Sequence, residues 1–145
     1  MKKLNFKLIT ILAGAFIAIA AFTSCASNKA VVTDDLSYSQ LIQKGQDASA
    51  NEDYQLANKY FIACIDTYGA DLKCYVETRY ELATNNLKQK KYQIAKTMFN
   101  EIIEIYDRPD AAYQVQPKFK KLAKIQLDKI TAIEEEQNKK TAKTK

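Results

Sequence analysis

Apolar residues recur at helical spacing along most of the chain beyond residue 36. In the last such segment, one helical face carries Phe119, Leu122, Ala123, Leu127, Ile130 and Ile133. The pattern predicts helices over residues 37–50, 53–68, 72–88, 91–107 and 117–138. Ser37 and Gln40 form a candidate capping box at the start of the first helix. The chain has only three glycines and two prolines, and these turn-forming residues are too few for a β-sheet protein. The composition therefore predicts an all-α fold.

An internal repeat links the middle helices. The motif Tyr-Gln-aliphatic-Ala occurs at 54–57 and again at 92–95. We call two residues equivalent when they are separated by the offset between positions 54 and 92. At this offset the correspondence extends in both directions. The equivalent pairs are Gly45 and Ala83, Phe61 and Phe99, Ile65 and Ile103, and Tyr68 and Tyr106. One helical hairpin is therefore used twice.

This repeat resembles the tetratricopeptide repeat, in which two antiparallel helices carry a small residue in the first helix and an aromatic, an alanine and another aromatic in the second. The resemblance implies two hairpins and a C-terminal capping helix, arranged as a short right-handed solenoid over residues 37–138. The period is longer than is usual in that family, as in the repeats of periplasmic outer-membrane lipoproteins.

In that family the first helix of each hairpin lines a concave surface that receives a partner. The resemblance therefore implies a partner-binding face in which Tyr80 is the expected anchor. Its members would be Ser39, Ile42, Gln43, Gln46 and Ser49 from the first hairpin, Glu77, Tyr80, Glu81 and Thr84 from the second, and Lys120, Lys121 and Lys124 from the last helix. The alternative for each position is a solvated helix face without a ligand.

The N-terminus has the layout of an export signal, with Lys2, Lys3 and Lys7 before an apolar run from Leu8 to Phe22. This run is shorter than the roughly 20 apolar residues that a membrane-spanning helix needs. The residues Phe22-Thr23-Ser24-Cys25 resemble the lipobox of bacterial lipoproteins. The resemblance implies a signal peptide at 1–24, acylation of Cys25, and a flexible tether at 25–36. Ordinary signal cleavage and an uncleaved anchor are the alternatives.

An acylated Cys25 would hold the protein on a membrane without crossing it. Ala26 and Ser27 follow, where many inner-membrane lipoproteins have Asp, so the resemblance favours the outer membrane and a domain facing the periplasm. Loss of the three signal lysines lowers the excess of basic residues from five to two, which argues against nucleic-acid binding. The positive charge concentrates after residue 111, where residues 139–145 are expected to form a disordered lysine-rich tail.

Catalysis is not expected. The chain has no histidine, which excludes the usual zinc ligand sets and histidine-based acid–base chemistry, and no glycine-rich phosphate loop. No enzyme activity, metal or cofactor is therefore predicted. Cys64 and Cys74 flank Gly69 symmetrically, and they are either a disulfide or two ordinary thiols.

The sequence favours an adaptor that binds another envelope protein or peptide segment. Two other functions stay open. One is an accessory component of a transport system that holds a small apolar ligand between its helices, and the other is a structural spacer. A cavity lined by Tyr and Phe would favour the first of these, whereas a filled core would favour the adaptor.

Overall fold

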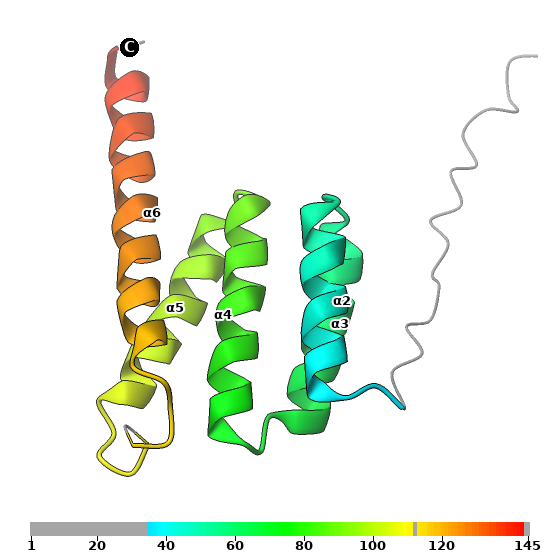
Figure 1. Ribbon diagram of the computed structural model, residues 1–145. Helices are drawn as coiled ribbons and strands as arrows, with labels where there is room; N and C mark the ends of the chain where they lie inside the picture. Colours follow the sequence, from blue (N-terminus) through cyan, green and yellow to red (C-terminus); the bar gives the residue numbers. More distant parts are fainter. Residues whose placement is uncertain (1–34, 112, 144–145) are drawn as a thin grey trace, which may run out of the picture. The chain divides into compact units, whose positions relative to one another are not determined.

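The computed structural model describes residues 35–143 except 112 and contains five helices in this part of the chain (Figure 1). No strand occurs among these residues, so the predicted all-α class is confirmed. The helices are α2 (Tyr38–Ala50), α3 (Tyr54–Tyr68), α4 (Leu72–Lys88), α5 (Tyr92–Tyr106) and α6 (Lys118–Lys143). The predicted signal peptide, Cys25 and residues 26–34 of the predicted tether lie outside the described residues.

The helix boundaries follow the sequence signals closely. The predicted capping box is present: the Ser37 hydroxyl accepts from the backbone N–H of Gln40, and the Gln40 side chain accepts from the backbone N–H of Ser37. Asp53 and Asp71 cap α3 and α4 through their carboxylates. Each cap satisfies backbone donors that the first turn of a helix leaves unpaired.

The predicted disordered tail at 139–145 is wrong for most of its length, because α6 continues to Lys143. Glu136 and Lys140 form an ion pair of 2.7 Å at the i, i+4 spacing. Such pairs favour helix locally, and no glycine or proline interrupts this segment.

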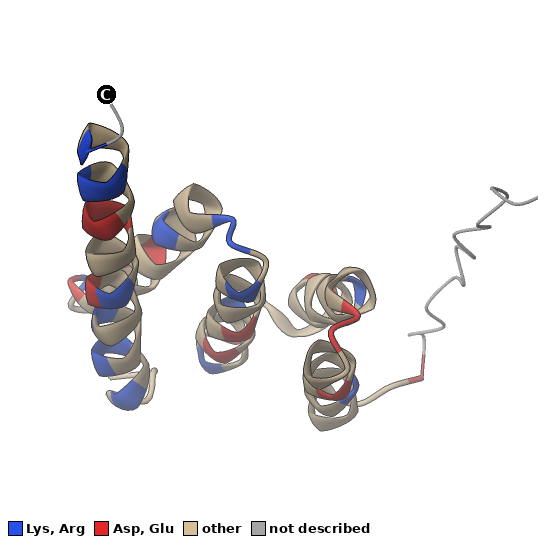
Figure 2. Ribbon diagram, turned by 90° about the horizontal axis from the view of Figure 1, so that it is seen from above, with Lys and Arg blue, Asp and Glu red and all other residues tan. Residues whose placement is uncertain are grey.

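The helices form two layers (Figures 1 and 2). Helices α2, α4 and α6 lie side by side in one layer, and α3 and α5 lie behind them. Each helix packs on the next one in the chain, and α4 also contacts both α2 and α6. We call the α2–α4 boundary the first seam and the α4–α6 boundary the second seam. Across residues 35–143, apart from 112, no helix has the length and apolar character of a membrane span.

The buried side chains form two clusters, one for each hairpin. In the first, Gly45 of α2 lies against the ring of Phe61 in α3. A Cβ at Gly45 would lie 2.4 Å from Phe61 Cε1, which only a residue without a side chain avoids. Ala83 and Phe99 occupy the equivalent positions and are fully buried in the second cluster. The repeat seen in the sequence is thus a repeat of packing.

The repeat extends to the hairpin turns. Glu52 and Lys90, which are equivalent positions, both have left-handed backbone, with φ of 61° and 60°. In both turns the next residue donates its backbone N–H back to the last turn of the helix, from Asp53 to Ala48 at 2.9 Å and from Lys91 to Asn86 at 3.0 Å. Left-handed backbone is the usual helix-terminating conformation, and glycine adopts it at the lowest cost.

We therefore expect Lys90→Gly to stabilise the protein by about 1 kcal/mol, because it relieves the cost of left-handed backbone in a residue with a Cβ. Lys59→Gly is the matched control. Lys59 is exposed in the middle of α3, so there the same change should destabilise by about 1 kcal/mol. Urea unfolding followed by circular dichroism measures both. A destabilising Lys90→Gly would contradict the turn geometry.

Candidate functional site

Polar side chains bridge the first seam. The Gln46 side-chain amide donates to Glu81 Oε1 at 2.9 Å, and Lys88 Nζ donates to Ser49 Oγ at 2.9 Å. These bonds join α2 to α4 across the layer of first helices. Gln46, Ser49 and Glu81 were predicted to lie on the partner-binding face, and the structure brings them together.

Glu81 is the most perturbed carboxyl group of this surface. Burial raises its pKa above the usual range, and the neighbouring Glu77 carboxylate raises it further. The hydrogen bond from Gln46 and the positive charges of Lys88 and Lys118 lower the pKa and offset part of the effect. The charged form of Glu81 is therefore held in a place that disfavours it.

Two residues predicted to contact a partner pack into the domain instead, Ile42 as a buried core residue and Tyr80 as a partly buried one. Ile42 is only 8% exposed and lies in the first cluster. Tyr80 packs its ring between Phe99 and Phe119, at centroid distances of 5.8 and 5.5 Å, and its hydroxyl accepts from the Gln126 side chain at 3.4 Å. Tyr80 is thus a packing residue between α4, α5 and α6, and the prediction of an exposed anchor was wrong.

The predicted contribution of α6 to the face is also displaced. Lys120 Nζ lies 2.7 Å from Asp107 Oδ1 and 6.0 Å from the ring centroid of Tyr106, so it points toward the C-terminal end of α5. Lys121 and Lys124 are exposed, and at roughly 100° per residue they lie about 140–160° around α6 from Gln126, which faces α4. The prediction placed these lysines as if α6 continued the repeat of α2 and α4, and α6 is not a copy of α4.

The remaining residues predicted for the partner-binding face lie at or near the layer of α2, α4 and α6. Gln43 and Ser39 are exposed, and the Gln43 side chain donates to Asp47 within α2 at 2.8 Å. Glu77 is partly buried beside Tyr38, whose pKa is raised by burial and then by the Glu77 carboxylate. Thr84 lies on α4, and its hydroxyl oxygen is buried without a hydrogen-bond partner.

The second seam contains a hollow of about 320 Å³ that sequence reasoning did not find. Side chains from α4, the α4–α5 turn, α5 and α6 contribute to it. We call it the second-seam hollow; it is lined by Thr84, Leu87, Lys88, Lys90, Tyr92, Gln126, Lys129 and Ile133. The lysines on both sides of the α4–α5 turn were the sequence feature that could have indicated this hollow, but only the packing of α6 brings Lys129 close to them.

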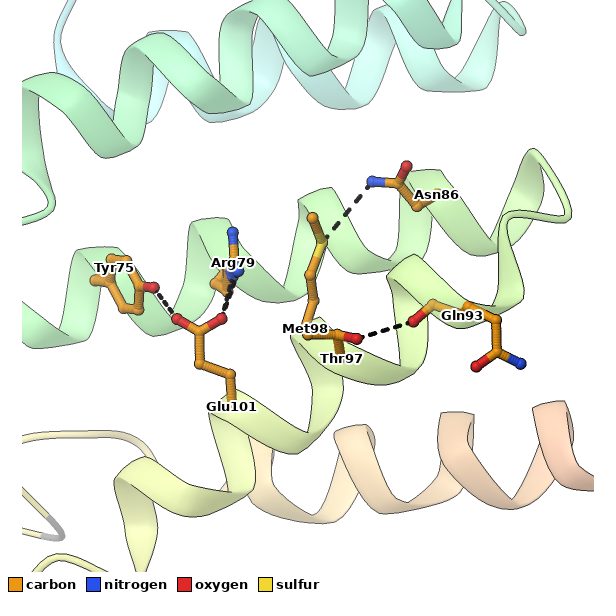
Figure 3. A network of polar contacts seen from close by, with 7 residues as sticks. All are labelled: Tyr75, Arg79, Asn86, Gln93, Thr97, Met98 and Glu101. Carbon is orange, nitrogen blue, oxygen red and sulfur yellow. Dashed lines mark hydrogen bonds and ion pairs between the residues drawn. The ribbon is translucent and has the colours of Figure 1, made fainter.

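A larger hollow of about 430 Å³ lies between the start of α4 and the end of α5. Its Glu101 carboxylate is already paired (Figure 3): it accepts from the Tyr75 hydroxyl and from the Arg79 guanidinium of α4, with Arg79 Nε at 2.9 Å. This network explains a charged residue at Arg79, and it joins α4 to α5. We assign it a structural role.

Cys64 and Cys74 are free thiols, so the disulfide alternative is not realised. Cys64 Sγ lies 3.4 Å from Thr78 Oγ1 in the buried interface of α3 and α4. Burial raises the pKa of both thiols, which lowers their thiolate fraction and reactivity. Among the residues that the structure describes, no group of three or more acidic or cysteine side chains could hold a metal ion.

A scan against protein-family models and searches of curated proteins and of solved structures found no match to this chain. The seams and their side chains are therefore the basis for assigning a function. Of the two, the first is bridged by two hydrogen bonds, and the second contains a hollow beside the bond between Gln126 and Tyr80.

The raised pKa of Glu81 makes stability depend on pH. Because the folded protein holds this proton more tightly than the unfolded chain, the contribution of Glu81 to stability falls as pH rises through its folded pKa. Glu81→Gln cannot ionise and still accepts from Gln46. We expect it to be more stable than the wild type at pH 7, with the difference vanishing below about pH 4.

Chemical denaturation of both proteins between pH 4 and pH 8 tests this expectation. Glu135→Gln is the matched control, since Glu135 is an exposed carboxylate of α6, and it should leave the pH profile unchanged. Equal pH profiles for Glu81→Gln and the wild type would rule out a desolvated Glu81.

Proposed function

We propose that this chain is a membrane-anchored lipoprotein of the bacterial cell envelope whose helical repeats bind another envelope protein as an adaptor, without chemistry of their own. The export signal, the lipobox-like Cys25 and the tetratricopeptide-like repeat support the anchor and the class of domain. The periplasmic side of the outer membrane is the favoured location, because Ala26 and Ser27 follow the cysteine.

The observation that carries the adaptor proposal is the layer formed by α2, α4 and α6. Three helices lie side by side, and polar or charged residues line both seams between them. A continuous surface with an apolar centre at the second seam and a polar rim suits recognition of a protein segment. The hollow in the second seam gives that surface a place where a partner side chain can enter.

The filled core supports the adaptor over a carrier of a small apolar ligand. Phe61 and Phe99 are at most 1% exposed, and Tyr80 packs between Phe99 and Phe119. These rings occupy the space that an apolar ligand would need. The two hollows described above and a third one beside Tyr92 and Glu134 lie between surface side chains, several of which are charged.

The predicted tether would keep the domain close to the membrane. From Cys25 to Leu36 an extended chain spans at most roughly 35–40 Å. Leu36 is fixed to the domain, since its carbonyl accepts from the Tyr68 hydroxyl at 2.9 Å. In Figure 1, α2 begins at one end of the layer, whereas α4 and α6 end at the other. The second-seam hollow therefore lies at the end of the layer opposite to Leu36.

Lipidation at Cys25 predicts that cells fed an alkyne fatty acid will label the wild-type chain and carry it in the membrane fraction. Cys25→Ser should lose the label and leave this fraction. Cys74→Ser is the control and should behave as the wild type, because Cys74 lies within the folded domain. Labelling that survives in Cys25→Ser would refute the anchor.

The adaptor proposal predicts that photoreactive residues at Gln46 and Lys129, one on each seam, will capture the same envelope protein in cells. The matched controls are Lys124, on the outer side of α6, and Tyr113, which is 93% exposed in the loop before it. Neither control should capture that protein. Absence of a shared product at the two seams would overturn the adaptor and favour a structural spacer.

A further inference from the structure

The repeat makes the two seams directly comparable. Thr84 is the equivalent of Gln46, and Leu87 is the equivalent of Ser49. At the first seam, the long Gln46 side chain crosses from α2 to Glu81 of α4. At the second seam, Thr84 is too short to cross to α6, and its hydroxyl oxygen is left buried without a partner. The same backbone position bridges the first seam but not the second, where the bond between Gln126 and Tyr80 joins α6 to α4 beside the hollow.

The second-seam hollow has an apolar floor. Leu87 is 8% exposed and belongs to the core of the second hairpin, and Tyr92 and Ile133 are partly buried beside it. At about 320 Å³, the hollow falls at the lower end of the range of ligand pockets. Gln126 adds a polar side chain to the lining. The space suits one apolar side chain together with a polar backbone.

The rim of the hollow is basic. Lys90 and Lys129 carry its positive charge, and no lining residue is acidic. In the described part of the chain, neither of these two lysines forms an ion pair with a carboxylate, whereas the Lys88 ammonium donates to Ser49 at the first seam. Lysine and arginine also mark the α4–α5 turn and α6 in Figure 2. This positive charge is thus available to an approaching anion.

Another hollow, of about 410 Å³, adjoins the second-seam hollow, since the two share Lys90 and Tyr92. Its lining includes Ile94, which is 48% exposed, and Glu134, whose carboxylate is already paired with Lys96 at 2.9 Å. The apolar surface around Tyr92 therefore continues over the start of α5. A peptide segment can extend in this direction from the second-seam hollow.

We propose that the second-seam hollow binds a segment of the partner protein in which one apolar side chain is flanked by Asp or Glu. The apolar side chain enters between Leu87, Tyr92 and Ile133. Its acidic neighbours face Lys90 and Lys129 of the rim. The assignment rests on the proposed adaptor function and names the chemistry of its partner.

Fluorescence anisotropy with the full chain in a non-ionic detergent tests the proposal. The probe is the labelled, amidated peptide Asp-Asp-Leu-Asp-Asp. We expect saturable binding below about 1 mM, and binding weaker by about fivefold or more for the peptide with Ser in place of Leu. The charge-reversed peptide Lys-Lys-Leu-Lys-Lys should not bind. Equal binding of the Leu and Ser peptides, or binding of the charge-reversed one, would overturn the proposal.

Variants locate the site. Thr84→Gln copies the bridging residue of the first seam into the second, so it should fill the hollow and weaken binding of the Leu peptide by about fivefold or more. The double variant Lys90→Gln/Lys129→Gln should weaken it to a similar degree through lost charge. Lys121→Gln/Lys124→Gln removes the same charge from the outer side of α6 and is the matched control.

Equal weakening by the control pair would show non-specific attraction to basic helices and overturn the site, as would unchanged binding in a Thr84→Gln chain that keeps its helical circular dichroism. The peptide experiment and the cellular crosslinking test different proposals. A shared crosslinked protein without peptide binding would support the adaptor function and contradict recognition of an acidic segment. Peptide binding without a shared crosslinked protein would support the binding site and contradict the adaptor function.

Discussion

Gly45 lies so close to the ring of Phe61 that no side chain fits between them, and the rest of the domain is built on this contact. It sets how near the two helices of a hairpin approach. In the second hairpin the equivalent residues are Ala83, which carries a Cβ, and Phe99; both are fully buried, and both hairpin turns contain a left-handed residue at matching positions. With the turn repeated and a small residue at the same position, α2 and α4 present equivalent positions along the same layer.

The positions where the two hairpins differ show which surfaces are covered. Leu82 of the second hairpin belongs to the cluster of the first, and Met98 packs against both clusters. Their equivalents in the first hairpin are Lys44 and Tyr60, whose ammonium and ring lie 5.9 Å apart on the outer side of that hairpin. A hairpin with no neighbour on that side needs a polar surface there, as terminal units of helical arrays do. At the other end, Phe119 of α6 completes the second cluster.

Local signals in the sequence identified the helices, the capping box at Ser37 and the repeat, because each depends on residues close together in the chain. The sequence misplaced Ile42, Tyr80 and the lysines of α6 for a different reason. Periodicity gives the angle between residues of one helix, but exposure depends on which neighbours that helix meets. Tyr80 is covered by Phe99 of α5 and by Phe119 of α6, which come from two neighbouring helices that the periodicity of α4 does not reveal. The hollow at Lys129 also depends on the placement of α6.

The unfavourable groups of the domain concentrate on α4, the helix with most neighbours. Glu81 is desolvated on its first-seam side, and the Thr84 hydroxyl is unpaired on its second-seam side, a defect that typically costs about 1–3 kcal/mol. Helix α4 tolerates both because it packs on all four other helices and supplies residues to both clusters. A repeat that copies its backbone can thus be bridged at one position of the first seam and hollow at the equivalent position of the second, because Gln46 is longer than Thr84. Local costs of this kind are typical of surfaces kept for binding.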